Sequence, residues 1–199
     1  MISTLLALDT SLLLSARWLV GPEYAHTVAF CGETIVVYGA LVLLGVWFAG
    51  IYQKKKEYKI YALEIFFTIV LTFVIYTIVN LGIPQWRISP QEVAGAIDPL
   101  IPHPIDNSFP SGHALFTAWL LVWLLRFFPN RWLIFGTLLF GLLTAGARVI
   151  GGIHYPGDIL GGWFFGTLGA MVGATLVTKP LFQKRIFPSL IRIASWLRL

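Results

Sequence analysis

Five long runs of mostly apolar residues constrain this chain more than any other feature of its sequence. A helix needs about 20 such residues to cross roughly 30 Å of hydrocarbon. Hydrophobic residues make up 57% of the chain and charged residues 12%, whereas about 25% of the residues in a soluble domain are charged. We therefore predict an all-α polytopic membrane protein with spans at Thr27–Ile51, Ile60–Ile83, His113–Phe128, Trp132–Ile150 and Ile159–Thr178.

Three further features complete the predicted fold. The segment Ile2–Val20 is short and interrupted by Asp9, so it either spans the membrane or lies in its interface. The His113–Phe128 run is also short, and we expect its helix to begin before His113. Polar residues recur every third position near the C-terminus, which predicts either an amphipathic interfacial helix within residues 180–199 or a frayed tail. Residues 1–199 thus form one domain of about six helices.

The basic residues predict the orientation. If the helices alternate in direction, eleven of the fourteen Lys and Arg residues fall on one side, and the positive-inside rule makes that side the cytoplasm. The net charge of +5 therefore indicates membrane topology rather than nucleic-acid binding. The only cysteine, Cys31, excludes an internal disulfide and a thiolate metal cluster.

Three polar clusters fall on the outer side under the same alternation. They are Asn80–Arg87, Phe109–His113 and Arg148–Asp158. Each cluster comes from a separate part of the chain, yet each adjoins the outer end of a predicted span. We therefore expect the three clusters to form one site.

The residue types in these clusters suit phosphate chemistry. Arginine side chains match phosphate oxygens with a planar fork, and backbone N–H groups at a helix start favour anions. Two histidines can act as nucleophile and acid near neutral pH, and a carboxylate four residues after one of them can accept its ring N–H. The pattern indicates metal-free phosphoryl transfer to water by His154, His113, Asp158, Arg148, Arg87, Ser111 and Gly112.

Two of the clusters also resemble the motifs of a known family. Pro110-Ser111-Gly112-His113 and Arg148-x5-His154-x3-Asp158 are similar to the second and third signature motifs of the type 2 phosphatidic acid phosphatase superfamily. The 101–111 stretch and the small size most resemble undecaprenyl pyrophosphate phosphatases of the bacitracin-resistance type. The resemblance runs from about Thr27 to Thr178, which is most of the chain.

The resemblance implies a role for each matching residue. His154 would attack phosphorus and form a phosphohistidine, and Asp158 would orient it. His113 would protonate the leaving oxygen and then activate water. The phosphoryl oxygens would be bound by Arg87, Arg148, Ser111, the Gly112 N–H and Asn80. No cofactor and no metal are implied.

The sequence departs from the family pattern at three positions. Asn80 and Ile88 stand where the first motif has lysine and proline, and Ala147 stands where the third motif has serine. Asn80 can donate a hydrogen bond but supplies no charge, so weaker phosphate affinity or a different headgroup is compatible with the sequence. Three other polar residues are candidates for supporting or headgroup contacts: Glu33 within a span, and His103 and Asp106 in the outer loop.

The expected function is hydrolysis of a membrane lipid pyrophosphate or phosphate. The resemblance favours undecaprenyl pyrophosphate as substrate, a bacterial plasma membrane location and a site on the extracytoplasmic side. Phosphatidylglycerophosphate, diacylglycerol pyrophosphate and lipid A 1-phosphate remain alternative substrates. A transporter and a non-catalytic lipid-phosphate binder are alternatives of another class, although the apolar span centres argue against a transporter. The expected partners are the lipid substrate and membrane lipids, without nucleic acid, and the oligomeric state is open.

Overall fold

The computed structural model describes residues 2–53, 56–82, 90, 99–101 and 107–196. Seven α-helices lie within these residues, and no strand does. The helices are α1 (Ile2–Arg17), α2 (Ala25–Gln53), α3 (Lys56–Gly82), α4 (Gly112–Phe127), α5 (Arg131–Ile150), α6 (Pro156–Val177) and α7 (Phe187–Trp196).

Four of the described helices are long and apolar enough to cross a membrane. They are α2 with the short turn before it, α3 from Ile60, α5 and α6. Their bounds lie within a few residues of the spans expected from the sequence, which confirms the all-α membrane fold. Bulky apolar side chains point outward along these helices, Phe48, Phe66, Leu142 and Phe164 among them. Such exposure is what a hydrocarbon environment favours.

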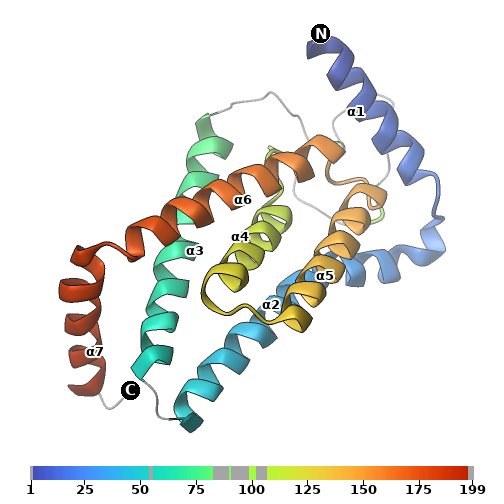
Figure 1. The fold of residues 1–199 in the computed structure, drawn as a ribbon. Helices are drawn as coiled ribbons and strands as arrows, with labels where there is room; N and C mark the ends of the chain where they lie inside the picture. The colour runs from blue at the N-terminus through green and yellow to red at the C-terminus, as the bar shows by residue number, and fades with distance from the viewer. Residues whose placement is uncertain (1, 54–55, 83–89, 91–98, 102–106, 197–199) are drawn as a thin grey trace.

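Helix α4 is the centre of the bundle. It has 16 residues and begins at Gly112, only one residue before His113, so it stays shorter than a usual span. The α6, α5, α3 and α2 helices all pack against it, and Figure 1 shows α6 crossing in front of it. Trp119, Leu120 and Trp123 of α4 are fully or almost fully buried. Because neighbouring helices enclose α4, it does not need the length that direct contact with lipid requires.

Glycines bring α6 close to α4. A Cβ atom on Gly162 would lie 2.4 Å from the Ser111 carbonyl oxygen, and one on Gly166 would lie 2.3 Å from the Leu115 carbonyl oxygen. Only glycine permits such an approach between helix backbones, as is common in membrane bundles. This contact, called the glycine seam below, sets the distance between the starts of α4 and α6.

The N-terminal helix α1 covers one end of the bundle. It spans 16 residues, which is about 24 Å of helix and less than the hydrocarbon thickness. Its neighbours are α5 and α6, and Leu13 is buried beside Tyr155 at the start of α6. Of the two possibilities left open for this segment, its length and its place at the bundle end favour the interfacial one.

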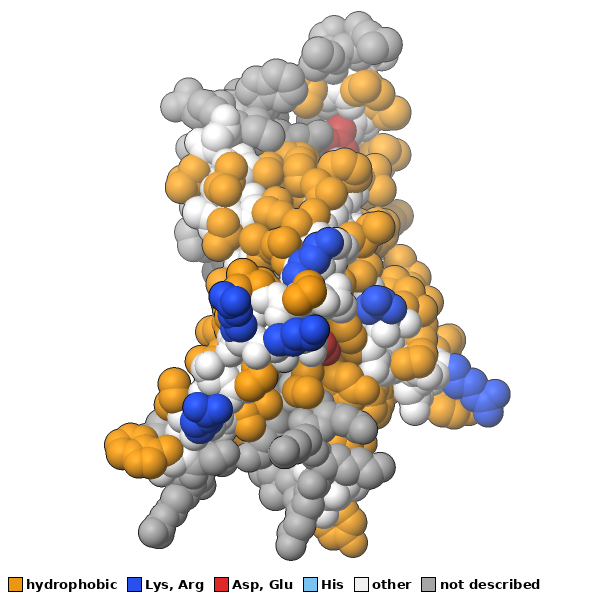
Figure 2. Space-filling view, turned by 60° about the vertical axis from the view of Figure 1, so that its left-hand side comes forward, with side chains coloured by type: hydrophobic (Ala, Val, Ile, Leu, Met, Phe, Trp, Pro, Cys, Tyr) orange, Lys and Arg blue, Asp and Glu red, His pale blue; other side chains and the backbone are white. Residues whose placement is uncertain are grey.

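Most of the described basic residues and the tail lie toward the other end of the bundle. Figure 2 shows Lys and Arg side chains spread over the middle and lower part of one face, with hydrophobic side chains above and between them. The segment before α7 is held to α3 by Gln183 Nε2, which donates to Glu64 Oε1 (3.2 Å) and to the Val177 carbonyl oxygen (2.9 Å). Phe187 is buried against Phe67. The placement of α7 on the inner membrane surface stays a prediction.

Candidate active site

One end of the bundle gathers the residues expected to act on phosphate. Glu33 lies on the third turn of α2, His113 on the first turn of α4, and Arg148 on the last turn of α5. His154 follows in the α5–α6 connection, and Asp158 lies in the first turn of α6. Helix ends from four elements therefore converge, as alternation of the spans predicts.

The Arg148 guanidinium connects three of these elements. Its Nε donates to the Gly32 carbonyl oxygen on α2 (3.3 Å). Its Nη2 contacts Glu33 Oε1 in an ion pair and lies 2.6 Å from His113 Nε2. Arg148 is buried, and a buried charge needs a partner of opposite sign. Glu33 supplies that partner, which explains a carboxylate inside a membrane helix.

Glu33 also contacts the expected proton donor. Its Oε2 lies 3.2 Å from His113 Nε2. A ring nitrogen carries one proton or one lone pair, so Nε2 either accepts from Arg148 or donates to Glu33 at a given moment. His113 Nε2 thus lies between the negative charge of Glu33 and the positive charge of Arg148.

The carboxylate of Asp158 lies beside one ring nitrogen of His154, the expected nucleophile. His154 Nδ1 lies 3.6 Å from Asp158 Oδ2, and both residues are buried. The same Oδ2 accepts from the Tyr155 backbone N–H (2.9 Å), a contact that fixes the carboxylate at the start of α6. With Nδ1 directed at Asp158, the Nε2 atom is the ring position left to react.

A direct backbone contact links the two motifs. The Ser111 backbone N–H donates to the Asp158 carbonyl oxygen (3.0 Å). The glycine seam is adjacent, because Gly162 approaches the carbonyl oxygen of the same Ser111. The Ser111 side chain is fully buried, and its Oγ contacts no hydrogen-bond partner among the described residues. The buried Ser108 Oγ likewise contacts no hydrogen-bond partner among the described residues. Buried hydroxyls usually find a partner, so both are candidate contacts for a phosphoryl oxygen.

Asn80 holds the loop before α4. Its Nδ2 donates to the carbonyl oxygens of Asn107 (3.2 Å) and Phe109 (2.9 Å), and Asn107 Nδ2 donates back to the Asn80 carbonyl oxygen (2.8 Å). Both donors of the Asn80 amide are therefore committed to backbone. The structure thus gives Asn80 a loop-holding contact, and phosphate binding by this residue stays a prediction.

Three expected site residues lie outside the described residues: Arg87, His103 and Asp106. Their predicted contacts with a phosphate or headgroup are therefore not described. Gly112 is the first residue of α4, and a Cβ atom there would lie 4.0 Å from Tyr76. The site as described consists of Glu33, Ser111, Gly112, His113, Arg148, His154 and Asp158.

Sequence reasoning missed Asp9 as a site-supporting residue, since it registered only as an interruption of the first segment. Asp9 is largely buried, and its Oδ1 accepts from the Gly157 backbone N–H (2.9 Å). Gly157 is the second residue of α6, so α1 provides an N-terminal cap for the helix that carries Asp158. A buried carboxylate in an otherwise apolar segment was the available signal.

We expect Asp9→Ala to loosen the segment that carries His154. Loss of an N-terminal cap costs about 1 kcal/mol of unfolding free energy, and slight misplacement of a reacting group lowers kcat by about tenfold. Thermal unfolding and phosphate release in detergent measure both effects. Ser11→Ala is the control, because Ser11 Oγ donates only to the Leu8 carbonyl oxygen of its own helix. Equal kcat values in the two variants would contradict this role for Asp9.

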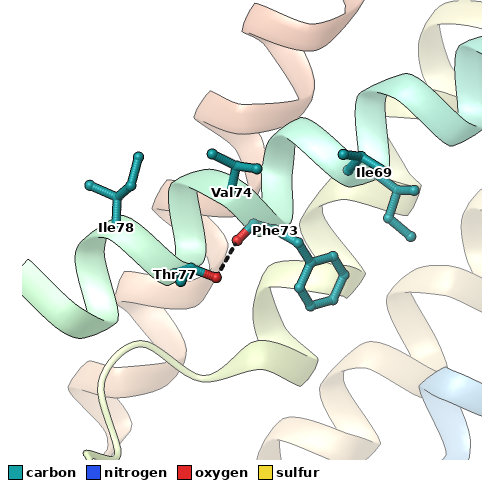
Figure 3. A pocket seen from close by; sticks show the side chains of 6 residues that line it. Ile69, Phe73, Val74, Thr77 and Ile78 are labelled. Carbon is teal, nitrogen blue, oxygen red and sulfur yellow. Dashed lines mark hydrogen bonds between the residues drawn. The ribbon is translucent and has the colours of Figure 1, made fainter.

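An apolar pocket of about 480 Å³ lies away from these groups, on α3. Figure 3 shows its lining side chains, which belong to Ile69, Val70, Phe73, Val74, Thr77 and Ile78. Its only side-chain oxygen is Thr77 Oγ1, which donates to the Phe73 carbonyl oxygen of the same helix (2.9 Å). The pocket carries no charged group, so it does not provide phosphate chemistry.

Comparison with known proteins identifies the family. The model of the PAP2 superfamily matches residues 57–181, which include nearly all of α3, the helices α4 to α6 and both motifs. The chain therefore belongs to the PAP2 superfamily and is a multi-pass membrane protein. The matched region leaves α1 and α2 outside, and with them Asp9 and Glu33.

Relatives agree with this assignment. Undecaprenyl-diphosphatase BcrC of Bacillus subtilis (strain 168) is 35% identical over 135 residues, which cover 67% of this chain and 65% of that relative. The bacitracin transport permease protein BcrC of Bacillus licheniformis is 30% identical over 76% of this chain and 72% of its own length. The chain thus matches just under two thirds of the length of the first of these relatives.

A solved structure shares the fold. It is the crystal structure of a transmembrane PAP2-type phosphatidylglycerolphosphate phosphatase from Bacillus subtilis. The TM-score is 0.57, the identity is 20%, and the match covers 87% of this chain and 86% of that one. This similarity supports the all-helical arrangement alone.

Proposed function

We propose that the protein is a lipid phosphatase that hydrolyses undecaprenyl diphosphate to undecaprenyl phosphate and inorganic phosphate. The observation that carries this proposal is the convergence of His113, Arg148, His154 and Asp158 at one end of the bundle. Relatives named undecaprenyl-diphosphatase in Bacillus subtilis and Sulfolobus acidocaldarius, the latter 31% identical over 103 residues, support the choice of substrate.

In the first step, the geometry supports a separate role for His154, Asp158 and His113. His154 Nε2 attacks the terminal phosphorus, and Asp158 on the Nδ1 side keeps the ring oriented and stabilises the charge that develops. The bond from phosphorus to the bridging oxygen breaks, and its electron pair leaves with the lipid phosphate. His113 Nε2 supplies a proton to that oxygen.

The second step returns the enzyme to its starting state. His113 Nε2 takes a proton from water, the water oxygen attacks the phosphohistidine, and the bond from phosphorus to His154 breaks. Arg148, the Ser111 hydroxyl and the Gly112 N–H stabilise the phosphoryl oxygens in both steps, as preorganised donors do at developing negative charge. Arg87 belongs to this set in the proposal.

The proposed location is the bacterial plasma membrane with the site on the extracytoplasmic side. Eight of the eleven basic residues on the expected inner side lie among the described residues, at the start of α3, the end of α4, the start of α5 or after α6, up to Arg192. The site residues lie at the opposite helix ends. The positive-inside rule then directs the site outward. A lipid phosphate there keeps its tail in the bilayer while its headgroup reaches His154.

The function is tested with purified protein in detergent. We expect phosphate release from undecaprenyl diphosphate, with the same rate in the presence of a chelator, because the proposed chemistry uses only side chains. Phosphatidylglycerophosphate, diacylglycerol pyrophosphate and lipid A 1-phosphate serve as competing substrates. Faster release from one of these lipids would replace the proposed substrate, and a strict requirement for an added divalent ion would contradict the mechanism.

A further inference from the structure

The Glu33 carboxylate makes the contacts that the proposed mechanism assigns to substrate. One of its oxygens contacts Arg148 Nη2, and the other lies 3.2 Å from His113 Nε2. In the mechanism above, a phosphoryl oxygen binds Arg148 and the leaving oxygen takes a proton from His113. An acceptor oxygen of the protein therefore stands in both places.

The Arg148 and Glu33 side chains of this ion pair differ in how far they can move. The Arg148 side chain is 5% exposed, whereas the Glu33 side chain is 55% exposed. Arg148 is also held by the Gly32 carbonyl oxygen. A half-exposed carboxylate on a helix can change rotamer without moving the backbone, but the buried guanidinium needs an anion beside it at all times. Exchange of Glu33 for a phosphate keeps Arg148 compensated throughout.

The charges around this carboxylate favour displacement by a strong anion. Among the described residues, the ionisable groups around the Glu33–His113 contact are His113 on α4, Arg148 on α5 and His154 in the α5–α6 connection. An incoming ligand must replace the carboxylate at Arg148 and also withstand repulsion from it, because like charges destabilise one another. A diphosphate carries two anionic groups and has more charge for this exchange than a monophosphate.

We propose that Glu33 is a specificity-determining residue whose carboxylate must leave the phosphate position when substrate binds, and that it thereby selects lipid diphosphates over lipid monophosphates. This inference rests on the proposed function. After cleavage, the lipid monophosphate has lost the group that displaced Glu33, and the carboxylate returns to Arg148 and His113 as the products leave. Glu33 lies outside the region matched by the family model, so the family motifs do not include this device.

The test compares Glu33→Gln with the parent protein and with Glu23→Gln. Glutamine keeps the size of the side chain and removes its charge. Glu23 is an exposed carboxylate near the start of α2, so its variant controls for the loss of one negative charge at the same end. The measurements are inhibition constants for orthophosphate and orthovanadate, and kcat/KM for undecaprenyl diphosphate and undecaprenyl phosphate.

We expect Glu33→Gln to bind orthovanadate about tenfold more tightly, since one charged competitor is lost. The preference for diphosphate over monophosphate falls by a similar factor, and Glu23→Gln behaves as the parent. Weaker or unchanged vanadate binding in Glu33→Gln would overturn the inference. A carboxylate that only holds Arg148 in place does not compete with vanadate, so its loss would not tighten vanadate binding.

Thermal unfolding provides a readout that does not depend on turnover. Orthovanadate stabilises a folded protein that binds it, and we expect a larger rise in Tm for Glu33→Gln than for the parent. A parent that neither releases phosphate nor is stabilised by vanadate contradicts the proposed function. A parent that does both, beside a Glu33→Gln variant without the larger rise, contradicts the inference about Glu33 alone.

Discussion

Replacement of His154 by alanine is expected to lower kcat by about 10⁴-fold or more. The proposed first step is attack by His154 Nε2, and no other histidine shares its position beside Asp158 among the described residues. The fold should persist, because the histidine contributes no membrane span and no part of the glycine seam. Phosphate release and thermal unfolding together distinguish loss of chemistry from loss of structure.

A trapping experiment makes this prediction sharper. With a label on the terminal phosphate of undecaprenyl diphosphate, the parent protein should retain an acid-labile phosphoryl group after rapid quenching, and His154→Ala should retain none. His26→Ala is the matched control, since His26 is an exposed histidine at the start of α2. Full activity in His154→Ala, or a label that survives in it, would remove His154 from the mechanism.

The second large effect is expected for Asp158→Asn, with a fall in kcat of about 10³–10⁴-fold. The Asp158 Oδ2 atom lies 3.6 Å from His154 Nδ1 and accepts from the Tyr155 backbone N–H. An amide oxygen in the Oδ2 position can keep both contacts, but it carries no negative charge to stabilise the positive charge that develops on His154 during attack. The amide nitrogen in that position would instead lose the backbone contact and face Nδ1 as a donor.

The size of this effect separates two roles of the carboxylate. If Asp158 only caps α6, the asparagine variant keeps the backbone bond and loses less than tenfold in kcat. If Asp158 orients and compensates His154, kcat falls by the larger factor while Tm changes little, and KM is nearly unchanged. Steady-state kinetics with undecaprenyl diphosphate, measured beside thermal unfolding, decide between these outcomes.

The sequence predicted the features that depend on spacing and on long apolar runs. The bounds of α2, α3, α5 and α6 lie within a few residues of the expected spans, since hydrophobic length alone determines a membrane helix. The contact between His154 and Asp158 followed from their separation of four residues. The convergence of α4, α5 and α6 ends followed from alternation of the spans.

Other features depend on contacts between distant residues, which spacing does not encode. The pairing of Glu33 with Arg148 joins positions 115 residues apart, and the contact of Asp9 with Gly157 joins positions 148 apart. The two contacts by which the Asn80 amide holds the loop before α4 were likewise not predicted, and phosphate binding by Asn80 stays a prediction. The short length of α4 was visible, but its enclosure by neighbouring helices was not.

The glycine seam has a consequence for how the protein responds to its surroundings. The start of α4 and the start of α6 are held together by backbone-to-backbone approach at Gly162 and Gly166, so their separation does not depend on side chains that lipids touch. A thicker or thinner bilayer tilts and shifts helices at the periphery. We therefore expect the spacing between His154 and His113 to change less with bilayer thickness than the positions of the peripheral helices do.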